Sequence, residues 1–375
     1  MPSKTVSVIA VGDIGPDRDD PATSFARTRA TLRRHDIGFC QLELALTERG
    51  GRLPQARHAV RGRKSIAPAL VDAGLSVVSF AGNHTMDWGP DALADTLETL
   101  RAAGAQPLGA GMTIVEARRP VYVESNGLRI AFLAYCSILP QSYWAEERRA
   151  GCAPMRAFTH YEQIEPDQPG TPCRVHTFPH REDLAAMGAD IRAAKQQADH
   201  VVVSHHWGIH FVPAIVADYQ REVGRAAIRA GAEAVLGHHA HILKGVEFFD
   251  GKPVFYSLGN FAIDLWIDEE HASRKSFKEV QALNPDWVVD FNSAYNFPPA
   301  SRRSMAVKLL FDATGLKDTR VLPVWIDREA VPAFPEPADP HFAEVVDYLR
   351  EISAHQGFKT TFTPVGNEVV VAPMA

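Results

Sequence analysis

Five stretches of apolar, strand-like sequence each stop at a side chain that can bind a metal ion. In open α/β sheets, functional groups gather just beyond the carboxyl ends of the strands. The pattern therefore predicts a fold that carries five distant segments to one edge. The residues at these ends are Asp13, Glu43, Asn83 with His84, His205 with His206, and His239 with His241.

The densest of these stretches is Gly237-His238-His239-Ala240-His241, which follows the apolar run 234–236. Alternate side chains of an extended chain point to the same side, so His239 and His241 are expected to face one region. Neutral imidazole is the commonest side-chain metal ligand. A histidine-rich surface turn is the alternative, but the ligand residues at the other strand ends favour a metal site.

Short apolar runs alternate with segments of helical period along most of the chain. This rhythm predicts a layered α/β fold, without a linker that would divide residues 1–375 into domains. Two irregular stretches, near 137–180 and 262–304, are predicted to be binding loops or lids over one opening. Asn126-Gly127 between two apolar runs predicts a hairpin. Helices are predicted near 21–34, 66–73, 90–103, 181–197, 218–230 and 340–355.

Composition narrows the classes of partner. The formal charge of −6 gives no reason to expect binding to nucleic acid or to an anionic membrane. No apolar run is long enough to span a bilayer. Residues 1–5 pass directly into the strand-like run 6–11, so we expect no signal peptide. The four cysteines are scattered without CxxC spacing, which favours a reducing, cytoplasmic location. The sequence does not indicate an oligomeric state.

The candidate ligands are oxygen and imidazole nitrogen, without thiolate. This set suits Mn, Fe, Zn or Co better than a soft metal. A structural zinc site is usually closed by cysteines at local spacing, so the expected site is catalytic and holds one or two divalent ions.

Several motifs together resemble the CapA (poly-γ-glutamate capsule biosynthesis) family, which is similar in fold to calcineurin-like metallophosphoesterases. The resemblance implies a four-layer α/β/β/α sandwich with a metal centre at one edge. The motifs are Gly12-Asp13, the stretch 41–47 (QLELALT), the stretch 81–89 (AGNHTMDWG), His206-Trp207-Gly208, the stretch 237–241 (GHHAH) and the stretch 256–261 (YSLGNF).

The resemblance also implies a ligand set. Glu43 would bridge two metals, with Asp13 and His241 at the first site and Asn83, His206 and His239 at the second.

One position departs from the wider pattern. Metallophosphoesterases usually place a histidine two residues after the first aspartate, where this chain has Gly15. The first site is therefore expected to lack one protein ligand. His205 and His210 are the candidates to fill the gap or to contact substrate. His210 stands where family members commonly have glutamate.

His84 is the candidate general acid, because it follows a predicted metal ligand directly. Asp87, three residues later, is expected to orient the His84 ring, as carboxylates orient catalytic histidines. The alternative for Asp87 is a helix N-cap before Pro90, and both roles are compatible.

Two further residues are candidates for substrate binding. Arg61 matches a basic position of the family and, with Arg63 and Lys64, could bind a carboxylate or phosphate. A solvated loop face is the alternative for Arg63 and Lys64. Asn260 follows another strand-like run and could contact substrate or an ordered water.

These observations predict a metal-dependent hydrolase in which a metal-bound hydroxide attacks a small or peptide-like anionic substrate. The scissile bond is either a γ-glutamyl-type amide, as the family name suggests, or a phosphoester, as the fold relatives suggest. Fold alone does not decide between them. A phosphomonoesterase or phosphodiesterase is one alternative. A non-catalytic capsule-assembly protein is the alternative of another class.

Overall fold

Two large β-sheets organise the computed structural model, which describes residues 4–56 and 59–374. The first sheet runs in the order β21-β22-β19-β18-β1-β2-β5-β6, with β17 beside β1 and β20 beside β19. Its strands are β1 (Thr5–Gly15), β2 (Ile37–Leu42), β5 (Val77–Ser79), β6 (Gln106–Leu108), β17 (Asn260–Ile263), β18 (Arg303–Asp312), β19 (Gly315–Ile326), β20 (Pro332–Ala333), β21 (Thr360–Val365) and β22 (Glu368–Pro373).

The second sheet has the order β15-β16-β14-β13-β9-β8. The predicted turn at Asn126-Gly127 joins its first two strands in the chain. These strands are β8 (Val121–Ser125), β9 (Leu128–Cys136), β13 (His200–His206), β14 (Ala234–His238), β15 (Val246–Phe249) and β16 (Lys252–Phe255).

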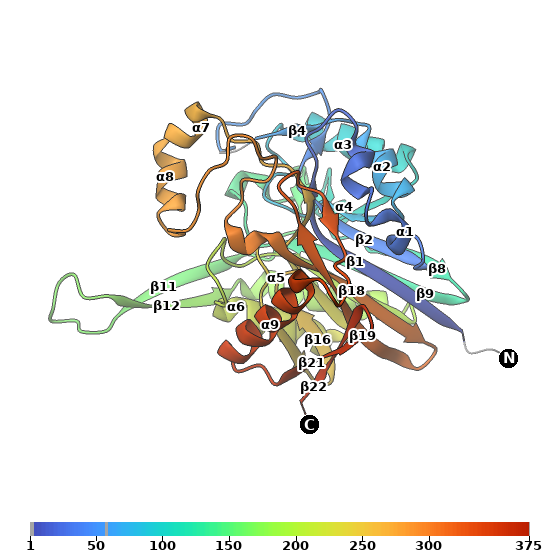
Figure 1. Ribbon diagram of the computed structural model, residues 1–375. Coiled ribbons are helices and arrows are strands. Elements are labelled where there is room, and N and C mark those ends of the chain that lie inside the picture. The colour runs from blue at the N-terminus through green and yellow to red at the C-terminus, as the bar shows by residue number, and fades with distance from the viewer. Residues whose placement is uncertain (1–3, 57–58, 375) are drawn as a thin grey trace.

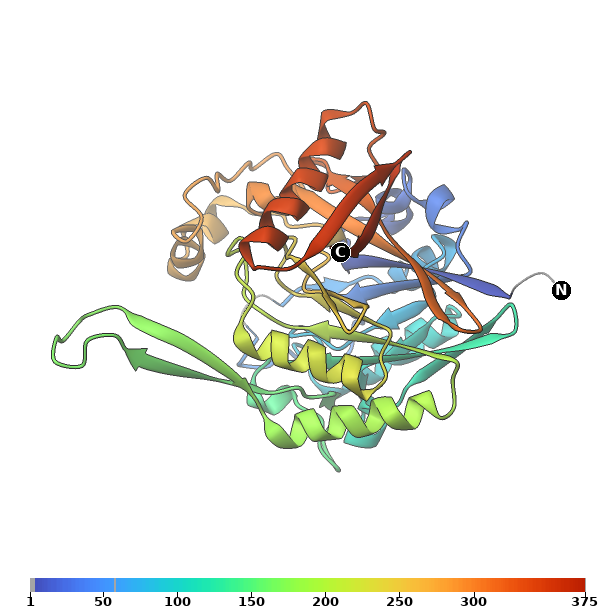
Figure 2. The ribbon, with the colours of Figure 1, turned by 90° about the horizontal axis from the view of Figure 1, so that it is seen from below.

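Apolar side chains fill three spaces between the layers. The two sheets face each other, and Phe39 of β2 stacks on Phe132 of β9 with 5.8 Å between ring centroids. Helices α2 (Ile66–Asp72) and α3 (Pro90–Ala102) cover the outer face of the first sheet. Helices α5 (Arg181–Lys195) and α6 (Asp218–Ala230) cover the outer face of the second (Figures 1 and 2). The layers therefore confirm the predicted α/β/β/α sandwich.

Parallel pairing brings the carboxyl ends of the central strands to one edge. β1, β2 and β5 are parallel in the first sheet, as are β9, β13 and β14 in the second. β17 also runs parallel to β1, with Asn260 beside Asp13. Gly12 permits this approach, because a Cβ atom there would lie 2.0 Å from the carbonyl oxygen of Gly259.

The C-terminal helix α9 (Pro340–His355) buries its apolar stripe against the sheets, as its periodicity predicts. Leu349 lies fully buried in this stripe. We expect Leu349→Ala to lower the free energy of unfolding by about 2–5 kcal/mol, because it leaves a cavity. Urea denaturation measures the change. Glu351→Ala, on the exposed side of the same helix, should cost less than about 0.5 kcal/mol. Equal losses of stability in the two variants would contradict the burial of Leu349 against the sheets.

The predicted helix at 21–34 was wrong in its extent. A short 3₁₀ turn, η1 (Pro21–Phe25), precedes a single helical turn, α1 (Arg29–Leu32). The Asp20 side chain accepts a hydrogen bond from the Ala22 amide, and the Thr23 hydroxyl donates to the Asp20 carbonyl oxygen. Such local side-chain bonds compete with a continuous helix.

The irregular stretch 137–180 contains regular structure that the sequence did not indicate. Strands β11 (Ala157–Gln163) and β12 (Cys173–Pro179) form a two-stranded hairpin that projects from the body (Figures 1 and 2). We call residues 157–179 the arm. The stretch 262–304 contains helices α7 (Glu269–Ser273) and α8 (Lys275–Gln281). The prediction of one domain over 1–375 stays a prediction.

No described helix has the length and apolar character needed to cross a bilayer. Residues 1–3, on which the expectation of no signal peptide partly rests, lie outside the described residues.

Candidate metal centre

Three predicted ligand atoms meet at one point between the sheets. His206 Nε2 lies 2.6 Å from Asn83 Oδ1 and 3.1 Å from His239 Nδ1. His239 Nδ1 lies 3.2 Å from Asn83 Oδ1. Atoms that share one cation at about 2.1 Å lie roughly 3 Å apart, so this triangle has the dimensions of a coordination site. His206 ends β13, whereas Asn83 and His239 stand in the turns after β5 and β14.

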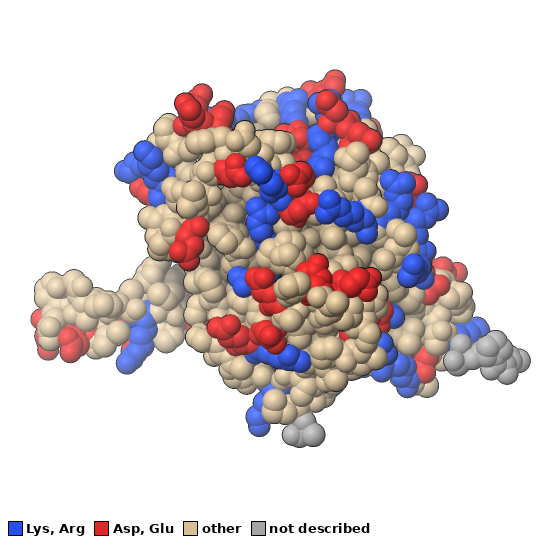
Figure 3. Space-filling view, viewed as in Figure 1, with Lys and Arg blue, Asp and Glu red and all other residues tan. Residues whose placement is uncertain are grey.

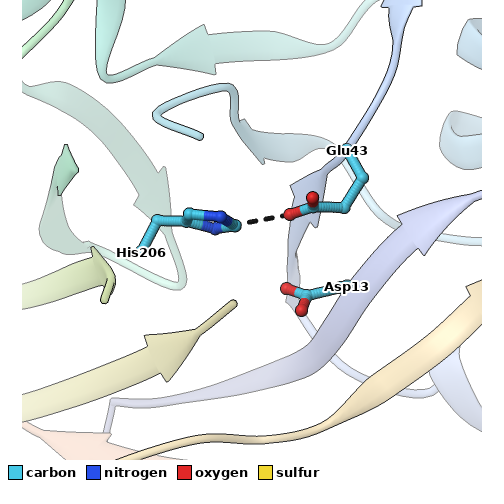
Figure 4. Close-up of side chains that lie close together, drawn as sticks. All are labelled: Asp13, Glu43 and His206. Carbon is cyan, nitrogen blue, oxygen red and sulfur yellow. Dashed lines mark ion pairs between the residues drawn. The ribbon is translucent and has the colours of Figure 1, made fainter. Parts of the chain in front are cut away.

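Two buried carboxylates lie beside this triangle. Glu43 Oε1 is 3.3 Å from His206 Nδ1, and Asp13, Glu43 and His206 offer atoms within 4.8 Å of one another (Figure 4). Asp13 Oδ1, Glu43 Oε1 and His206 Nδ1 are buried without a hydrogen-bond partner among the described residues. Buried polar atoms are normally satisfied. Their convergence here fits a bound cation.

Burial shapes the protonation of the cluster. It lowers the pKa of His206 and His239 well below the usual value, which favours the neutral imidazole that metals require. Burial and the neighbouring charges of Asp13 and Asp87 raise the pKa of Glu43 well above the usual range. For Asp13, burial acts in the same direction, but the imidazoles of His238 and His241 outweigh it and hold the pKa far below normal. A divalent cation would favour both carboxylates in charged form.

His239 and His241 reach the site by a different geometry from the alternation that we predicted. Strand β14 ends at His238, and the next residues form a turn. His239 has φ of 87° and His241 has φ of 54°, which is uncommon for residues other than glycine. Such strained backbone clusters at functional sites. The two rings do converge, with 6.1 Å between their centroids.

A polar chain orients the His241 ring. His241 Nδ1 lies 2.7 Å from Asn260 Oδ1 and 3.3 Å from Asp13 Oδ2. Asn260 in turn donates to the Tyr295 hydroxyl at 2.9 Å. A partner on one ring nitrogen sets the tautomer and leaves Nε2 as the ligand atom. Asn260 therefore supports a predicted ligand; its predicted contact with substrate stays a prediction.

His238 is a site residue that our sequence reasoning did not assign. Its Nδ1 lies 3.2 Å from Asp13 Oδ1, and the ring is buried against Phe39 between the sheets. In the parallel register His238 pairs with His206, so both rings enter the space between the sheets. The signal was present in the His238-His239 pair, which we read only through the alternation of His239 and His241.

His84, Asp87 and Tyr143 form a chain of hydrogen bonds at the margin of the cluster, which we call the relay. His84 Nδ1 lies 2.7 Å from Asp87 Oδ2, and Asp87 Oδ1 accepts a hydrogen bond from the Tyr143 hydroxyl at 3.1 Å. The alternative of Asp87 as a helix N-cap is wrong, because Gly89 occupies that position. The His84 side chain keeps 23% exposure, so solvent or substrate can reach it. Tyr143 had no sequence signal that connected it to Asp87.

His205 does not belong to the site, which corrects its prediction as a gap-filling or substrate-binding residue. Neighbouring residues of a strand point to opposite faces, so His206 faces the other sheet and His205 faces the helices. The His205 ring stacks on Trp207 with 4.4 Å between centroids. Burial lowers its pKa to about 3, so it is a neutral core residue.

His210 lies directly over two of the candidate ligand histidines. Its ring stacks on His239 with 3.9 Å between centroids and on His241 with 5.1 Å. Burial lowers its pKa to about 3. The loop 208–216 that carries His210 is covered by residues of the stretch 262–304, where Trp287 packs on Phe211. Residues of this second stretch therefore cover the loop that carries His210; their predicted role as a lid stays a prediction.

The position of the missing histidine is filled by apolar side chains. A Cβ atom on Gly15 would lie 3.2 Å from Leu44 Cγ and 3.3 Å from Ile263 Cγ1. A side chain at residue 15 therefore requires both neighbours to give way by a few tenths of an ångström.

Arg61 is held by its own loop. Its guanidinium donates to the carbonyl oxygens of Glu48 at 2.6 Å and Gly50 at 2.7 Å, and it lies over the Trp88 ring. Arg63 pairs with Asp19, and Lys64 pairs with Asp95. Substrate binding by Arg61 stays a prediction.

Lys244 is buried near the site and donates to the Val212 carbonyl oxygen. Burial lowers its pKa from 10.5 to about 7. The unfolded chain therefore binds more protons between pH 7 and 10, and this residue destabilises the fold most below pH 7.

We expect Lys244→Met to be more stable than wild type at pH 7. The difference should shrink by up to about 1.4 kcal/mol per pH unit as pH rises to 10. Urea denaturation of metal-free protein measures the free energy of unfolding of both proteins from pH 7 to 10. A stability difference that does not change with pH would contradict the prediction.

The fold is thus a four-layer sandwich with an imidazole, amide and carboxylate cluster at its strand ends. Residues 7–265 match the model of the family described as bacterial capsule synthesis protein PGA_cap. The chain belongs to this family, as its motifs predicted.

The chain is similar to curated relatives of the family. It is 30% identical over 202 residues to PGA biosynthesis protein CapA of Bacillus subtilis, covering 54% of this chain and 46% of the relative. It is 29% identical over 238 residues to a probable polyglutamine synthesis accessory protein of Mycobacterium tuberculosis, covering 61% and 56%. The chain thus spans about half the length of the curated relatives that it matches.

Among solved structures, the chain is similar to calcineurin-like phosphoesterase YfkN from Bacillus subtilis. The TM-score is 0.41 with 12% sequence identity, and the match covers 95% of this chain and 98% of that chain.

Proposed function

We propose that this protein is a metal-dependent hydrolase whose centre holds one or two divalent ions of Mn, Zn, Fe or Co. The observation that carries the proposal is the triangle of Asn83 Oδ1, His206 Nε2 and His239 Nδ1, with edges of 2.6–3.2 Å. These three residues and Glu43 would hold the better-formed site. Asp13, Glu43 and His241 would hold the other site, which lacks the ligand that Gly15 cannot supply.

Bound cations would polarise water and neutralise negative charge on the attacked group. The chain's own contribution to the chemistry is a proton held at His84. Asp87 accepts from His84 Nδ1, so a ring that carries a second proton holds it on Nε2, and that is the proton it can donate to a leaving group. Tyr143 holds the other oxygen of Asp87 and so keeps the carboxylate in line with the ring. His210 and Phe211 cover the ligand histidines and limit access of solvent.

The proposed substrate is small or peptide-like and anionic, with either a phosphoester or a γ-glutamyl-type amide bond. The family supports the amide, because relatives are named for PGA and capsule biosynthesis. A phosphomonoesterase or phosphodiesterase remains the alternative that the fold class supports. Cytoplasmic location and the absence of a nucleic-acid or membrane partner stay predictions from composition.

The test is turnover after metal loading. Metal-stripped protein is loaded with Mn²⁺ or Zn²⁺ and assayed with an aryl phosphate, an aryl phosphodiester and a γ-glutamyl anilide. Hydrolysis of one class, abolished by chelation and restored by the metal, supports the proposal and selects the bond. Metal binding without turnover of any of the three would refute the hydrolase.

A non-catalytic role in capsule assembly is the second candidate. It is favoured by the similarity to a relative that is named an accessory protein. An intact His84-Asp87-Tyr143 relay counts against it, since an assembly protein has no need of an oriented proton donor.

A further inference from the structure

The side chain of His238 is fully buried without a hydrogen-bond partner among the described residues. Both of its ring nitrogens, Nδ1 and Nε2, lack one. Buried polar groups are normally hydrogen-bonded, because leaving them unpaired costs free energy. A protonated ring would bury two N–H groups without acceptors, whereas a neutral ring that binds a cation through one nitrogen would bury only one. The ring is therefore better suited to bind a cation than to carry a charge.

One of the two nitrogens faces an oxygen that is also without a partner. His238 Nδ1 lies 3.2 Å from Asp13 Oδ1, but the two atoms are not aligned as a hydrogen-bond donor and acceptor. Two atoms that bind the same cation at about 2.1 Å lie roughly 3 Å apart, and each directs a lone pair at the ion rather than at the other atom. The separation of this pair and its lack of a hydrogen bond therefore fit two ligands of one ion.

The other oxygen of Asp13 is already used by the chain. Asp13 Oδ2 accepts a hydrogen bond from the His239 amide at 3.1 Å and lies 3.3 Å from His241 Nδ1. These contacts hold the carboxylate so that Oδ1 is turned toward His238. Oδ1 is thus the oxygen of Asp13 that is left to bind an ion, and His238 is the imidazole beside it.

The charges around His238 also favour a cation at this point. Asp13, Glu43 and His206 offer atoms within 4.8 Å of one another, and Glu43 Oε1 is also without a partner among the described residues (Figure 4). On the face of the molecule shown in Figure 3, acidic side chains lie at the surface with basic ones among them. In the core, by contrast, Asp13 lies beside His238 and Glu43 lies beside His206. A divalent cation here would balance both carboxylate charges.

We infer that His238 Nδ1 is a ligand of the first metal ion, in place of the histidine that this chain lacks at Gly15. The inference rests on the metal centre of the proposed function, but not on hydrolysis. The first site then has four protein ligands, two carboxylates and two imidazoles, a set that suits Mn, Fe, Zn or Co. These ligands are Asp13, Glu43, His238 and His241.

Two consecutive histidines then serve different ions. His238 ends β14, and its ring enters the space between the sheets, as does the ring of its register partner His206. The chain turns at His239, whose φ is 87°, and His239 Nδ1 joins the triangle with Asn83. In a continuous strand the two rings would point to opposite faces. The turn is what allows both rings to reach the centre.

Metal binding by the full chain tests the inference without a substrate. Metal-stripped protein is titrated with Co²⁺, and equilibrium dialysis gives the number of ions bound. Wild type should bind two ions, and His238→Leu should bind one. The affinity for the lost ion should fall by more than about a hundredfold, because loss of even an outer partner of a ligand costs about 10–100-fold. His205→Leu is the matched control. It makes the same exchange at a buried histidine that faces the helices, so it should bind two ions.

Nuclear magnetic resonance separates a ligand from a residue that only orients Asp13. In the Co²⁺ protein, each ligand imidazole has an exchangeable N–H proton whose signal is strongly shifted by the paramagnetic ion. His238→Asn places an amide oxygen near the position of Nδ1. This variant should keep the ion at the first site, with weaker affinity, and should lose one shifted N–H signal. An asparagine that merely replaced a hydrogen bond to Asp13 would leave every shifted signal in place.

Two ions bound by His238→Leu, or an unchanged set of shifted signals in His238→Asn, would overturn the inference and leave the proposed centre intact. A wild type that binds a single ion would also overturn it, as would a His238→Asn protein that keeps no ion at the first site. A wild type that binds no ion would overturn the proposed centre as well. Hydrolysis is decided separately, by the turnover assay.

Discussion

Replacing His206 by alanine is expected to remove the metal from the better-formed site. His206 Nε2 completes the triangle with Asn83 and His239, and its Nδ1 faces Glu43. Loss of an outer partner of a ligand already costs about 10–100-fold in metal affinity, so loss of the ligand itself should cost more than about a hundredfold. Elemental analysis of protein purified without chelator, followed by titration with Zn²⁺ or Mn²⁺, measures the stoichiometry and the affinity.

The neighbouring histidine is the matched control. His205 stands on the same strand but faces the helices, where its ring stacks on Trp207 and both ring nitrogens lack a partner among the described residues. His205→Leu should therefore keep the metal content of wild type and should not reduce stability. Full metal retention in the His206 variant would refute the proposed centre. Equal loss in both variants would show an effect on folding.

Replacing His84 by alanine is expected to lower kcat by about 10²–10⁴-fold while the metal content stays unchanged. The His84 ring is oriented by Asp87 at 2.7 Å, yet it belongs to no edge of the ligand triangle. Its loss should therefore remove proton transfer and leave the cations in place. The measurement is kcat with the substrate class selected by the turnover assay, together with elemental analysis of the same sample.

Tyr143→Phe tests whether Tyr143 helps to orient Asp87 and His84, and it changes the relay less than the loss of His84 does. It removes the hydrogen bond to Asp87 and leaves both groups of the pair, so kcat should fall by less than in the His84 variant. The dependence of kcat on leaving-group pKa gives a second readout: without His84, poor leaving groups should suffer most. An equal loss for good and poor leaving groups would show that His84 is not the general acid.

The sequence was most informative where one physical cause dominates. Apolar periodicity predicted β2, α6 and α9 at their observed bounds. The burial of apolar side chains determines where such elements begin and end. The convergence of the candidate ligand residues was predicted for a related reason, since strand ends that meet at one edge depend on the parallel order alone.

Features decided by distant contacts were missed. The C-terminal hairpin of β21 and β22 was not predicted, and neither was the arm. The role of Tyr143 depends on a loop that folds back to Asp87, 56 positions earlier. His205 and His206 both follow the same apolar run, and their register in the sheet decides which of them faces the space between the sheets.

The packing around Gly15 has a consequence for substitution at this position. Leu44 and Ile263 occupy the volume into which a side chain at residue 15 would grow. A Cβ atom at residue 15 would be tighter than ordinary contact with both, so each would have to give way by a few tenths of an ångström before a histidine could stand there. A substitution that shortens Leu44 or Ile263 would therefore make the histidine easier to accept, and the two changes together should cost less stability than the histidine alone.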